Sequence, residues 1–151
     1  MSPRAVARDE AGNAVVELVW LGLLLLIPLV WIVMSVFDVQ RGAYGVAGGA
    51  RAAGRAFALA PDDATGRRRA EAAARQALAD QGMADAPVQV RVSCTPYPAD
   101  CHNGTSVVTV RVVSRVVLPM LPDVLGAGRP TFRVEASHTV PIGRYQELGA
   151  P

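Results

Sequence analysis

The chain has 151 residues and a mass of 15.9 kDa, a length that accommodates one modest domain and excludes a multi-domain enzyme. Its 15 basic residues, all arginine, nearly balance 13 acidic ones for a formal net charge of +2, which argues against a nucleic-acid-binding protein. Hydrophobic residues make up 51% of the chain but aromatic residues only 5%. The apolar content therefore lies in Ala, Val and Leu, a composition typical of membrane helices or small-residue packing.

The first element expected along the chain is a transmembrane helix. Residues 18–37 read LVWLGLLLLIPLVWIVMSVF, 20 consecutive residues without a charged side chain. As a helix they would span about 30 Å, the thickness of the hydrocarbon core of a bilayer. A cleaved secretory signal has a shorter apolar region followed by a small-residue site, so we predict that this segment is retained in the lipid bilayer.

The two cysteines bear on the orientation of this span. Arginines flank the apolar segment on both sides, so the positive-inside rule does not decide. Cys94 and Cys101 bracket a short loop and would form a disulfide in an oxidising compartment. A disulfide favours a cytoplasmic N-terminus and an extracytoplasmic position for residues 38–151, whereas the alternative is a pair of buried free thiols.

Residues 38–60 are expected to continue the span as a helical extension. Each glycine in a helix interior costs about 1 kcal/mol relative to alanine, so the glycines of this segment need a reason. Gly45 and Gly49 are four residues apart, a spacing that lets another helix approach closely. We expect them to form an assembly face for a partner helix, and the alternative is a flexible stretch where the rod frays.

Residues 61–151 are expected to form an extracytoplasmic α+β region. Either Asp62 or Asp63 would cap a second, short helix that ends near Gln81, with Gly82 as its C-terminal cap. Three segments then alternate apolar and polar residues: one from Ala86 onward, one over 105–118 and one over 131–140. The predicted fold class is α+β, with a long N-terminal transmembrane helix, a second short helix and a three-stranded antiparallel sheet. One face of the sheet should be covered by the second helix or by the extension.

Few residues are candidates for catalysis or for metal binding. His102 and His138 have no recognisable spacing from a nucleophile or a carboxylate pair. Cys94, Cys101 and His102 lack a fourth ligand and a common zinc spacing. We therefore expect no catalysis, no metal and no cofactor. The three arginines at 67–69 are expected to form a solvated helix face rather than a lipid-binding cluster, which usually has more basic residues.

The most informative pattern lies just before the apolar segment. A short polar leader ends at Gly12, and Asn13 to Glu17 run directly into the span. A carboxylate at the membrane interface needs a partner or a shallow position. A cut after Gly12 would give Asn13 a free amine about one helical turn from Glu17, and the amine of a neighbouring subunit would serve equally well. The alternative is that Glu17 lies at headgroup depth.

At these residues the sequence resembles the class III, type IV-like prepilins, whose peptidase recognises a Gly followed by four residues and then Glu ahead of an apolar helix. Over about residues 9–60 it is more closely similar to the TadE-like pseudopilins of the tight-adherence (Flp) pilus system, with DEAGNAVVEL, one apolar helix and the extension GARAAGRAFA. The resemblance implies a leader over 1–12, cleavage between Gly12 and Asn13, a mature transmembrane helix over 13–37 and an assembly role for Glu17. Leu18 stands where the family's pilins often have an aromatic residue.

The resemblance implies a membrane-anchored pseudopilin or minor pilin that assists assembly of a tight-adherence pilus. Its partners would be the prepilin peptidase, sibling pseudopilins, the pilus assembly platform and the lipid bilayer, with no role for nucleic acid. The alternative is an uncleaved, signal-anchored binding module whose sheet and disulfide loop recognise a surface ligand. In that case the spacing of Gly12 and Glu17 would be a coincidence.

Overall fold

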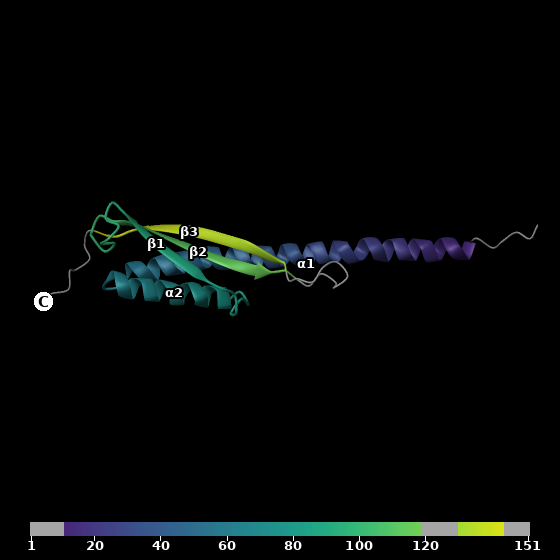
Figure 1. Ribbon diagram of the computed structural model, residues 1–151, viewed down its shortest axis with the longest axis horizontal. Coiled ribbons are helices and arrows are strands. Elements are labelled where there is room, and N and C mark those ends of the chain that lie inside the picture. The colour runs from purple at the N-terminus through teal and green to yellow at the C-terminus, as the bar shows by residue number, and fades with distance from the viewer. Residues whose placement is uncertain (1–10, 119–129, 144–151) are drawn as a thin grey trace, which may run out of the picture.

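The computed structural model describes residues 11–118 and 130–143, which form two helices and three strands. Helix α1 spans Ala11–Ala58 and helix α2 spans Asp63–Ala79. Strands β1, β2 and β3 span Gln89–Thr95, Val107–Val117 and Thr131–Pro141. Figure 1 shows that α2 and the sheet lie along the C-terminal part of α1, while the N-terminal part projects away from them. The predicted α+β class, with its long apolar helix, second helix and three-stranded antiparallel sheet, is confirmed.

The apolar segment and the extension form one helix without a break. The helix α1 has 48 residues and continues through every glycine between Gly42 and Gly54. A Cβ added at Gly54 would lie 3.0 Å from Val140, and one added at Gly42 would overlap the side chain of Val116. These two glycines therefore let the sheet approach the helix backbone. In the structure the extension is helical throughout, and the sheet packs against it at these glycines.

Helix α2 begins at a capping aspartate, and a glycine turn follows its end. The Asp62 side chain accepts a hydrogen bond from the Thr65 backbone N–H at 2.8 Å, so Asp62 is the N-cap. The helix ends at Ala79, two residues before the expected end. Gly82 then adopts φ +75°, a left-handed conformation that favours glycine, and the chain turns away from the helix.

The sheet has the order β1-β2-β3, and both strand pairs are antiparallel. Strand β1 begins at Gln89 rather than at Ala86. The central strand alternates strictly, and its inward side chains are buried: Val108, Val110, Val112, Ser114 and Val116. On β3, Phe132 lies on the same face as the buried Val134 but is 50% exposed, because it lies near the start of an edge strand. The alternation of apolar and polar residues therefore predicted the buried face of the sheet correctly, except at the start of β3.

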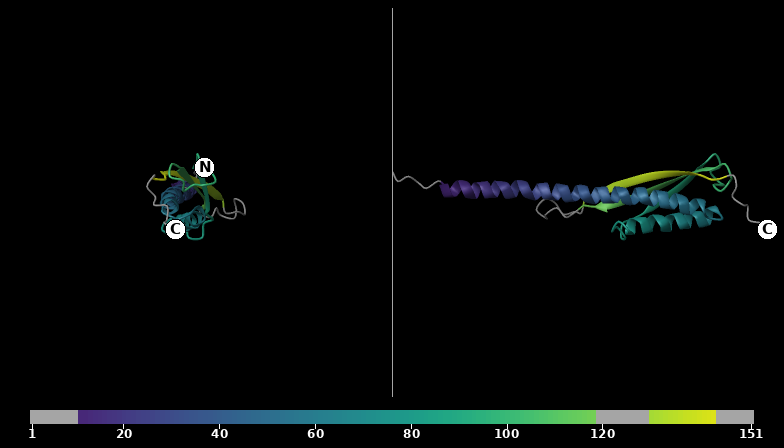
Figure 2. Two further views of the ribbon diagram at one scale, coloured as in Figure 1. Left: turned by 90° about the vertical axis from the view of Figure 1, so that its left-hand side faces the viewer. Right: turned by 180° about the vertical axis from the view of Figure 1, so that it is seen from behind.

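Helix α1 is the element on which both α2 and the sheet pack, and one buried core joins all of them. The C-terminal part of α1 covers the inner face of β2 and β3, and α2 packs on another side of α1 with little contact to β1. Figure 2 shows from behind that β3 and α2 lie on opposite sides of α1. Of the two coverings considered for the sheet, the extension is the one observed. The shared core is built largely from small residues and valines, with Phe57 and Leu78 as its largest fully buried side chains.

Phe57 of α1 packs closely against α2. Its fully buried ring lies against Gly66, where an added Cβ would come within 2.9, 3.0 and 3.3 Å of three ring atoms. By contrast, a Cβ at Gly48 would meet nothing within 4 Å. Alanine can therefore be introduced at Gly66, where the neighbouring ring leaves no room, and at Gly48, where the space is open.

We predict that Gly66→Ala lowers the free energy of unfolding by about 1–3 kcal/mol, because the methyl group would displace a rigid buried ring. Gly48→Ala should raise it by up to about 1 kcal/mol, because alanine has the higher helix propensity and nothing opposes the methyl group. Chemical denaturation of both full-length variants in detergent checks the signs. Equal effects at the two sites would contradict the close packing of Phe57 on Gly66.

Candidate functional site

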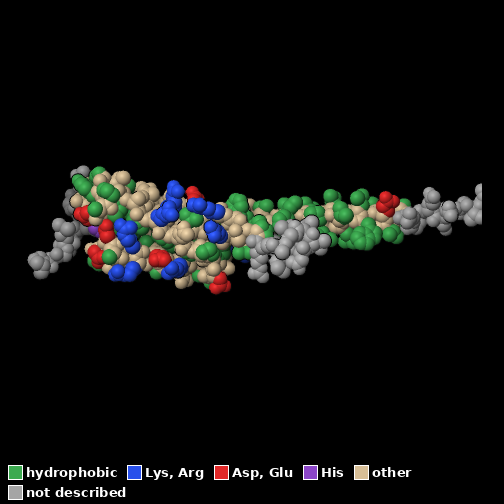
Figure 3. Space-filling model, in the orientation of Figure 1, with side chains coloured by type: hydrophobic (Ala, Val, Ile, Leu, Met, Phe, Trp, Pro, Cys, Tyr) green, Lys and Arg blue, Asp and Glu red, His purple; other side chains and the backbone are tan. Residues whose placement is uncertain are grey.

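The apolar segment of α1 is exposed rather than packed in a core. One helix near the N-terminus is long and apolar enough to cross a membrane, and none of its most apolar window is buried. Leu24 and Leu25 are 70% and 71% exposed, and most other side chains over 18–37 are similarly uncovered. Figure 3 shows hydrophobic side chains along this part of the rod. An exposed apolar surface of this extent marks a membrane or protein interaction site.

The predicted processing and assembly residues lie at the start of α1. Most of the predicted leader, residues 1–10, lies outside the described residues. Gly12 and Asn13 belong to the first turn of α1, and Glu17 lies one and a half turns beyond Gly12 with an exposed side chain. Among the described residues, Glu17 makes no ion pair. The structure therefore places the carboxylate at the edge of the apolar segment, open to a partner.

Gly45 and Gly49 have an occupant within the chain. A Cβ at Gly49 would lie 3.3 Å from Leu78 and 3.6 Å from the Cα of Ala74, both in α2. A Cβ at Gly45 would lie 2.7 Å from Met83, just after α2. The spacing of these glycines does admit a helix, but in the structure that helix is α2 of the same chain and not one from a neighbouring subunit. A direct intermolecular contact through these two glycines stays a prediction.

The two cysteines form a disulfide at the end of the domain far from the apolar segment. Cys94 ends the inward face of β1, Cys101 follows the loop, and their Cα atoms lie 5.4 Å apart. Both residues are buried, and the structure describes no free cysteine. Because both sulfur atoms are bonded to each other, neither is a zinc ligand. Within the described residues no group of three or more His, Cys, Asp or Glu side chains could hold a metal ion.

Asp63 and His102 tie the disulfide loop to the corner between α1 and α2. The His102 Nδ1 atom lies 2.5 Å from an oxygen of the Asp63 carboxylate, and the other oxygen accepts a hydrogen bond from the Cys101 N–H at 3.1 Å. His102 Nε2 lies 3.1 Å from the carbonyl oxygen of Phe57, and the two rings stack with centroids 4.9 Å apart. One histidine therefore contacts the ends of both helices and the loop.

The contacts of His102 limit how its ring can hydrogen-bond. A carboxylate and a backbone carbonyl can only accept hydrogen bonds, so each ring nitrogen that takes part must donate. The pair is largely shielded from solvent, with the His102 and Asp63 side chains 11% and 26% exposed.

The pKa of Asp63 lies below its ordinary value. Desolvation at this half-buried position raises the pKa, but the hydrogen bonds from His102 and Cys101 and the positive charges of His102 and Arg67 together lower it further. The ionised carboxylate is thus the form that the folded corner stabilises. Sequence reasoning missed this pair, since Asp63 and His102 are 39 residues apart and no local spacing connects them.

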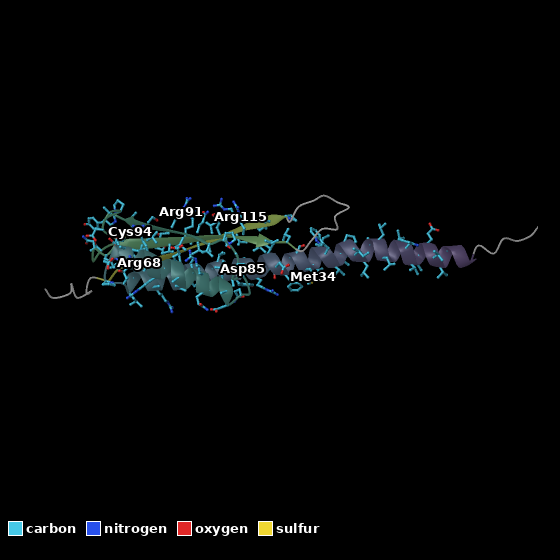
Figure 4. All side chains as sticks on the ribbon, turned by 60° about the horizontal axis from the view of Figure 1, so that its bottom comes forward. Met34, Arg68, Asp85, Arg91, Cys94 and Arg115 are labelled. Carbon is cyan, nitrogen blue, oxygen red and sulfur yellow. A yellow bond between two sulfur atoms is a disulfide. The ribbon has the colours of Figure 1, made fainter. Side chains whose placement is uncertain are left out.

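Arginines gather on the outer face of the sheet, which no helix or strand of the described residues covers. Arg91 lies directly opposite Arg111, and Arg115 lies directly opposite Arg133. Glu135 contacts Arg133 at 3.0 Å and Arg111 at 3.8 Å. Figure 4 shows Arg91 and Arg115 on the side of the sheet away from the helices. Like charges directly opposite each other disfavour strand pairing, so this face costs stability and is open to solvent.

Comparison with known proteins finds no similar protein. The sequence matches no protein-family model, and neither the curated proteins nor the solved structures contain a match to the chain. The functional argument therefore depends on the residues and their geometry.

We predict that Cys94 and Cys101 are oxidised in protein isolated from the cell envelope. Closing a loop of this length stabilises the fold by about 2.5 kcal/mol in the chain-entropy model, so reduction should lower the free energy of unfolding by a similar amount. Intact-mass measurement after alkylation without reductant should show no added group. Two alkylated thiols would contradict both the disulfide and the extracytoplasmic position derived from it.

We predict that Asp63→Asn lowers the free energy of unfolding by about 1.5–3 kcal/mol near neutral pH, the range for a hydrogen bond to a charged group. Because the folded pKa of Asp63 is lowered, the wild type keeps this contribution above the unfolded value of about 3.9 and loses it as the pH falls through the folded pKa. The variant should lack that part of the acid dependence.

Denaturation of both proteins from neutral pH down to pH 2 measures the difference. Asp100→Asn is the matched control, because Asp100 lies in the same loop and its carboxylate makes no hydrogen bond with the described residues. If the Asp63 and Asp100 variants behave alike, the corner does not depend on the ion pair.

Proposed function

We propose that the chain is a membrane-anchored pseudopilin or minor pilin that assists assembly of a tight-adherence pilus and is processed between Gly12 and Asn13. The observation that supports this most directly is the continuity of α1. The Gly12-to-Glu17 spacing, the exposed apolar segment and the packed outer part all belong to one unbroken helix. A subunit of this shape can pack side by side with others along its apolar part while it carries its domain outside the bilayer.

In this proposal, Glu17 determines how neighbouring helices are aligned along their axes. Its exposed carboxylate stands at the edge of the apolar segment and makes no ion pair among the described residues. A carboxylate near the hydrocarbon is costly without a partner. The free amine that processing creates at Asn13 of a neighbouring chain would pair with it, so one axial offset between helices is favoured over the others.

The domain points out of the cytoplasm in this proposal. The disulfide at the far end of the sheet supports an oxidising compartment for residues 38–151. Since Gly45 and Gly49 already contact the chain's own residues, sibling pseudopilins would pack along residues 18–37. The glycines would then contribute to assembly by holding α2 and the domain in place. Prepilin peptidase and the assembly platform would act at the membrane end of the same helix.

We predict that N-terminal sequencing of the envelope protein gives Asn-Ala-Val-Val-Glu. Gly12→Leu should block processing, because a bulky side chain would occupy the small-residue site of the peptidase, while the full-length chain still inserts. Gly22→Leu is the control, since nothing lies within 4 Å of an added Cβ at this position inside the apolar segment. An intact leader in a strain with an active prepilin peptidase would instead favour the anchored binding module.

Glu17→Ala tests the role of the carboxylate separately. The variant should insert at least as well as the wild type, because the desolvation cost of the charge is gone. It should still be processed, yet it should co-purify less with sibling pseudopilins after cross-linking, because the charge that fixes the register is absent. Unchanged co-purification would show that Glu17 merely lies at headgroup depth.

A further inference from the structure

The end of the sheet nearest the apolar segment reaches back beside that segment. Leu118, the residue after β2, lines a shallow apolar groove together with Trp31 and Val36 of α1. The Leu118 N–H donates a hydrogen bond to the Pro130 carbonyl oxygen at 2.9 Å, so β2 and β3 stay paired to this end. Both helix residues belong to the uncharged segment 18–37. When that segment spans a bilayer, the end of the sheet therefore lies at the membrane surface.

Two hydrophobic side chains are uncovered at the same end. Val117 is the last residue of β2 and is 51% exposed, and Phe132, which lies opposite Val116, is 50% exposed. Val116 itself packs against Gly42, five residues or about 7.5 Å along the helix beyond Phe37. The headgroup layer on each side of a bilayer is about 5–7 Å thick. The two exposed side chains are therefore close to headgroup depth.

A pair of arginines lies just beyond these side chains. Arg115 and Arg133 are directly opposite each other on the outer face, and Arg115 is two residues from Val117. Arg133 shares Glu135 with Arg111, whereas Arg115 makes no ion pair among the described residues. Like charges directly opposite each other disfavour strand pairing, and an anion bound between them would offset that cost. Figure 4 shows Arg115 at the end of the sheet nearest the apolar part of α1.

We propose that this end of the sheet docks on the bilayer surface, where Arg115 and Arg133 bind the phosphate groups of anionic phospholipids. Guanidinium groups are well suited to phosphate, and their apolar stems let the charged ends extend toward the headgroups. Val117 and Phe132 contact the boundary between headgroups and acyl chains. The inference rests on the membrane anchoring in the proposed function, and does not depend on processing or on a pilus.

The charge of the outer face favours an anionic lipid over a second copy of the chain. A negatively charged membrane surface attracts basic side chains close to it. Against a single acid, Glu135, the face carries four arginines: Arg91, Arg111, Arg115 and Arg133. A second copy would offer its α2, where four exposed arginines outnumber the acidic residues: Arg67, Arg68, Arg69 and Arg75. Two such surfaces would repel each other.

The other arginine pair of the same face provides an internal reference. Arg91 and Arg111 are also directly opposite each other. Arg111 lies four residues before Arg115 on β2, about 13 Å further from the apolar segment. Each pair contains one arginine that contacts Glu135 and one that makes no ion pair among the described residues. The two pairs therefore differ mainly in their distance from the anchor.

The depth of the sheet is measured on the full-length protein in lipid nanodiscs. Trp20→Phe and Trp31→Phe remove the two native tryptophans, and Phe132→Trp then places one reporter at the end of the sheet. Phosphatidylcholine with a nitroxide on its headgroup should quench this reporter. Tyr97→Trp in the same background is the matched control, because Tyr97 is 44% exposed and lies in the disulfide loop at the far end. The control should stay unquenched.

Lipid selectivity is measured in nanodiscs that contain equal amounts of phosphatidylglycerol and phosphatidylcholine with identical acyl chains. The protein is extracted in mild detergent, and its retained lipids are quantified by mass spectrometry. We expect phosphatidylglycerol to be enriched about fivefold, the factor for one unshared basic group at a charged membrane surface. Arg115→Gln with Arg133→Gln should bring the ratio of the two lipids close to one. Arg91→Gln with Arg111→Gln changes the charge equally but should leave most of the enrichment.

The outcomes that would overturn the proposal differ from one another. Failure of the wild type to co-migrate with the nanodiscs would refute the membrane anchor, and the docking with it. An unquenched reporter at position 132 in inserted protein would refute the docking and leave the anchor intact. A blue-shifted emission without quenching would show that protein, such as a second copy, covers this end instead. Equal retention of the two lipids, or an equal loss with both arginine pairs, would refute phosphate binding by Arg115 and Arg133.

Discussion

Close packing on the outer part of α1 is the constraint on which the rest of the domain depends. The sheet and α2 contact each other little, and each is held mainly by α1. Such packing on different sides of one helix requires small residues there, and Gly42 and Gly54 face the sheet while Gly49 faces α2. Glycine lowers helix propensity at each position, so the isolated extension would be a weak helix. The two neighbours that the glycines admit compensate by burying Val46, Ala50, Ala53 and Phe57.

The corner around His102 closes the domain at its far end. Without the disulfide loop, the last turn of α1 and the first turn of α2 would meet solvent there with unpaired backbone groups. His102 covers the ring of Phe57 and contacts its carbonyl oxygen, and Asp63 accepts the Cys101 N–H. The disulfide restricts the loop, and the contacts of Asp63 with His102 and Cys101 attach it to the helices. Each makes the other more effective, because a restricted loop loses less entropy when it docks.

Much of this fold could be predicted from local patterns. The uncharged run, the Asp62 cap and the alternation of valines each depend on nearest neighbours in sequence, and each appears in the structure. What failed depended on distant partners. The spacing of Gly45 and Gly49 shows that a helix can approach but not whose helix it is, and no motif links Asp63 to His102.

The continuity of α1 couples the position of the apolar segment to that of the domain. No linker separates residues 18–37 from the packed part, and the sheet and α2 stiffen the helix from Gly42 onward. From Glu17 to Ala58 the helix rises about 60 Å at 1.5 Å per residue. In the proposed assembly, an axial offset or rotation between neighbouring apolar segments would therefore be carried along one continuous helix to the arginine-lined sheet face. A flexible joint would lose that information, which is a physical reason for a helix that keeps its glycines packed instead of exposed.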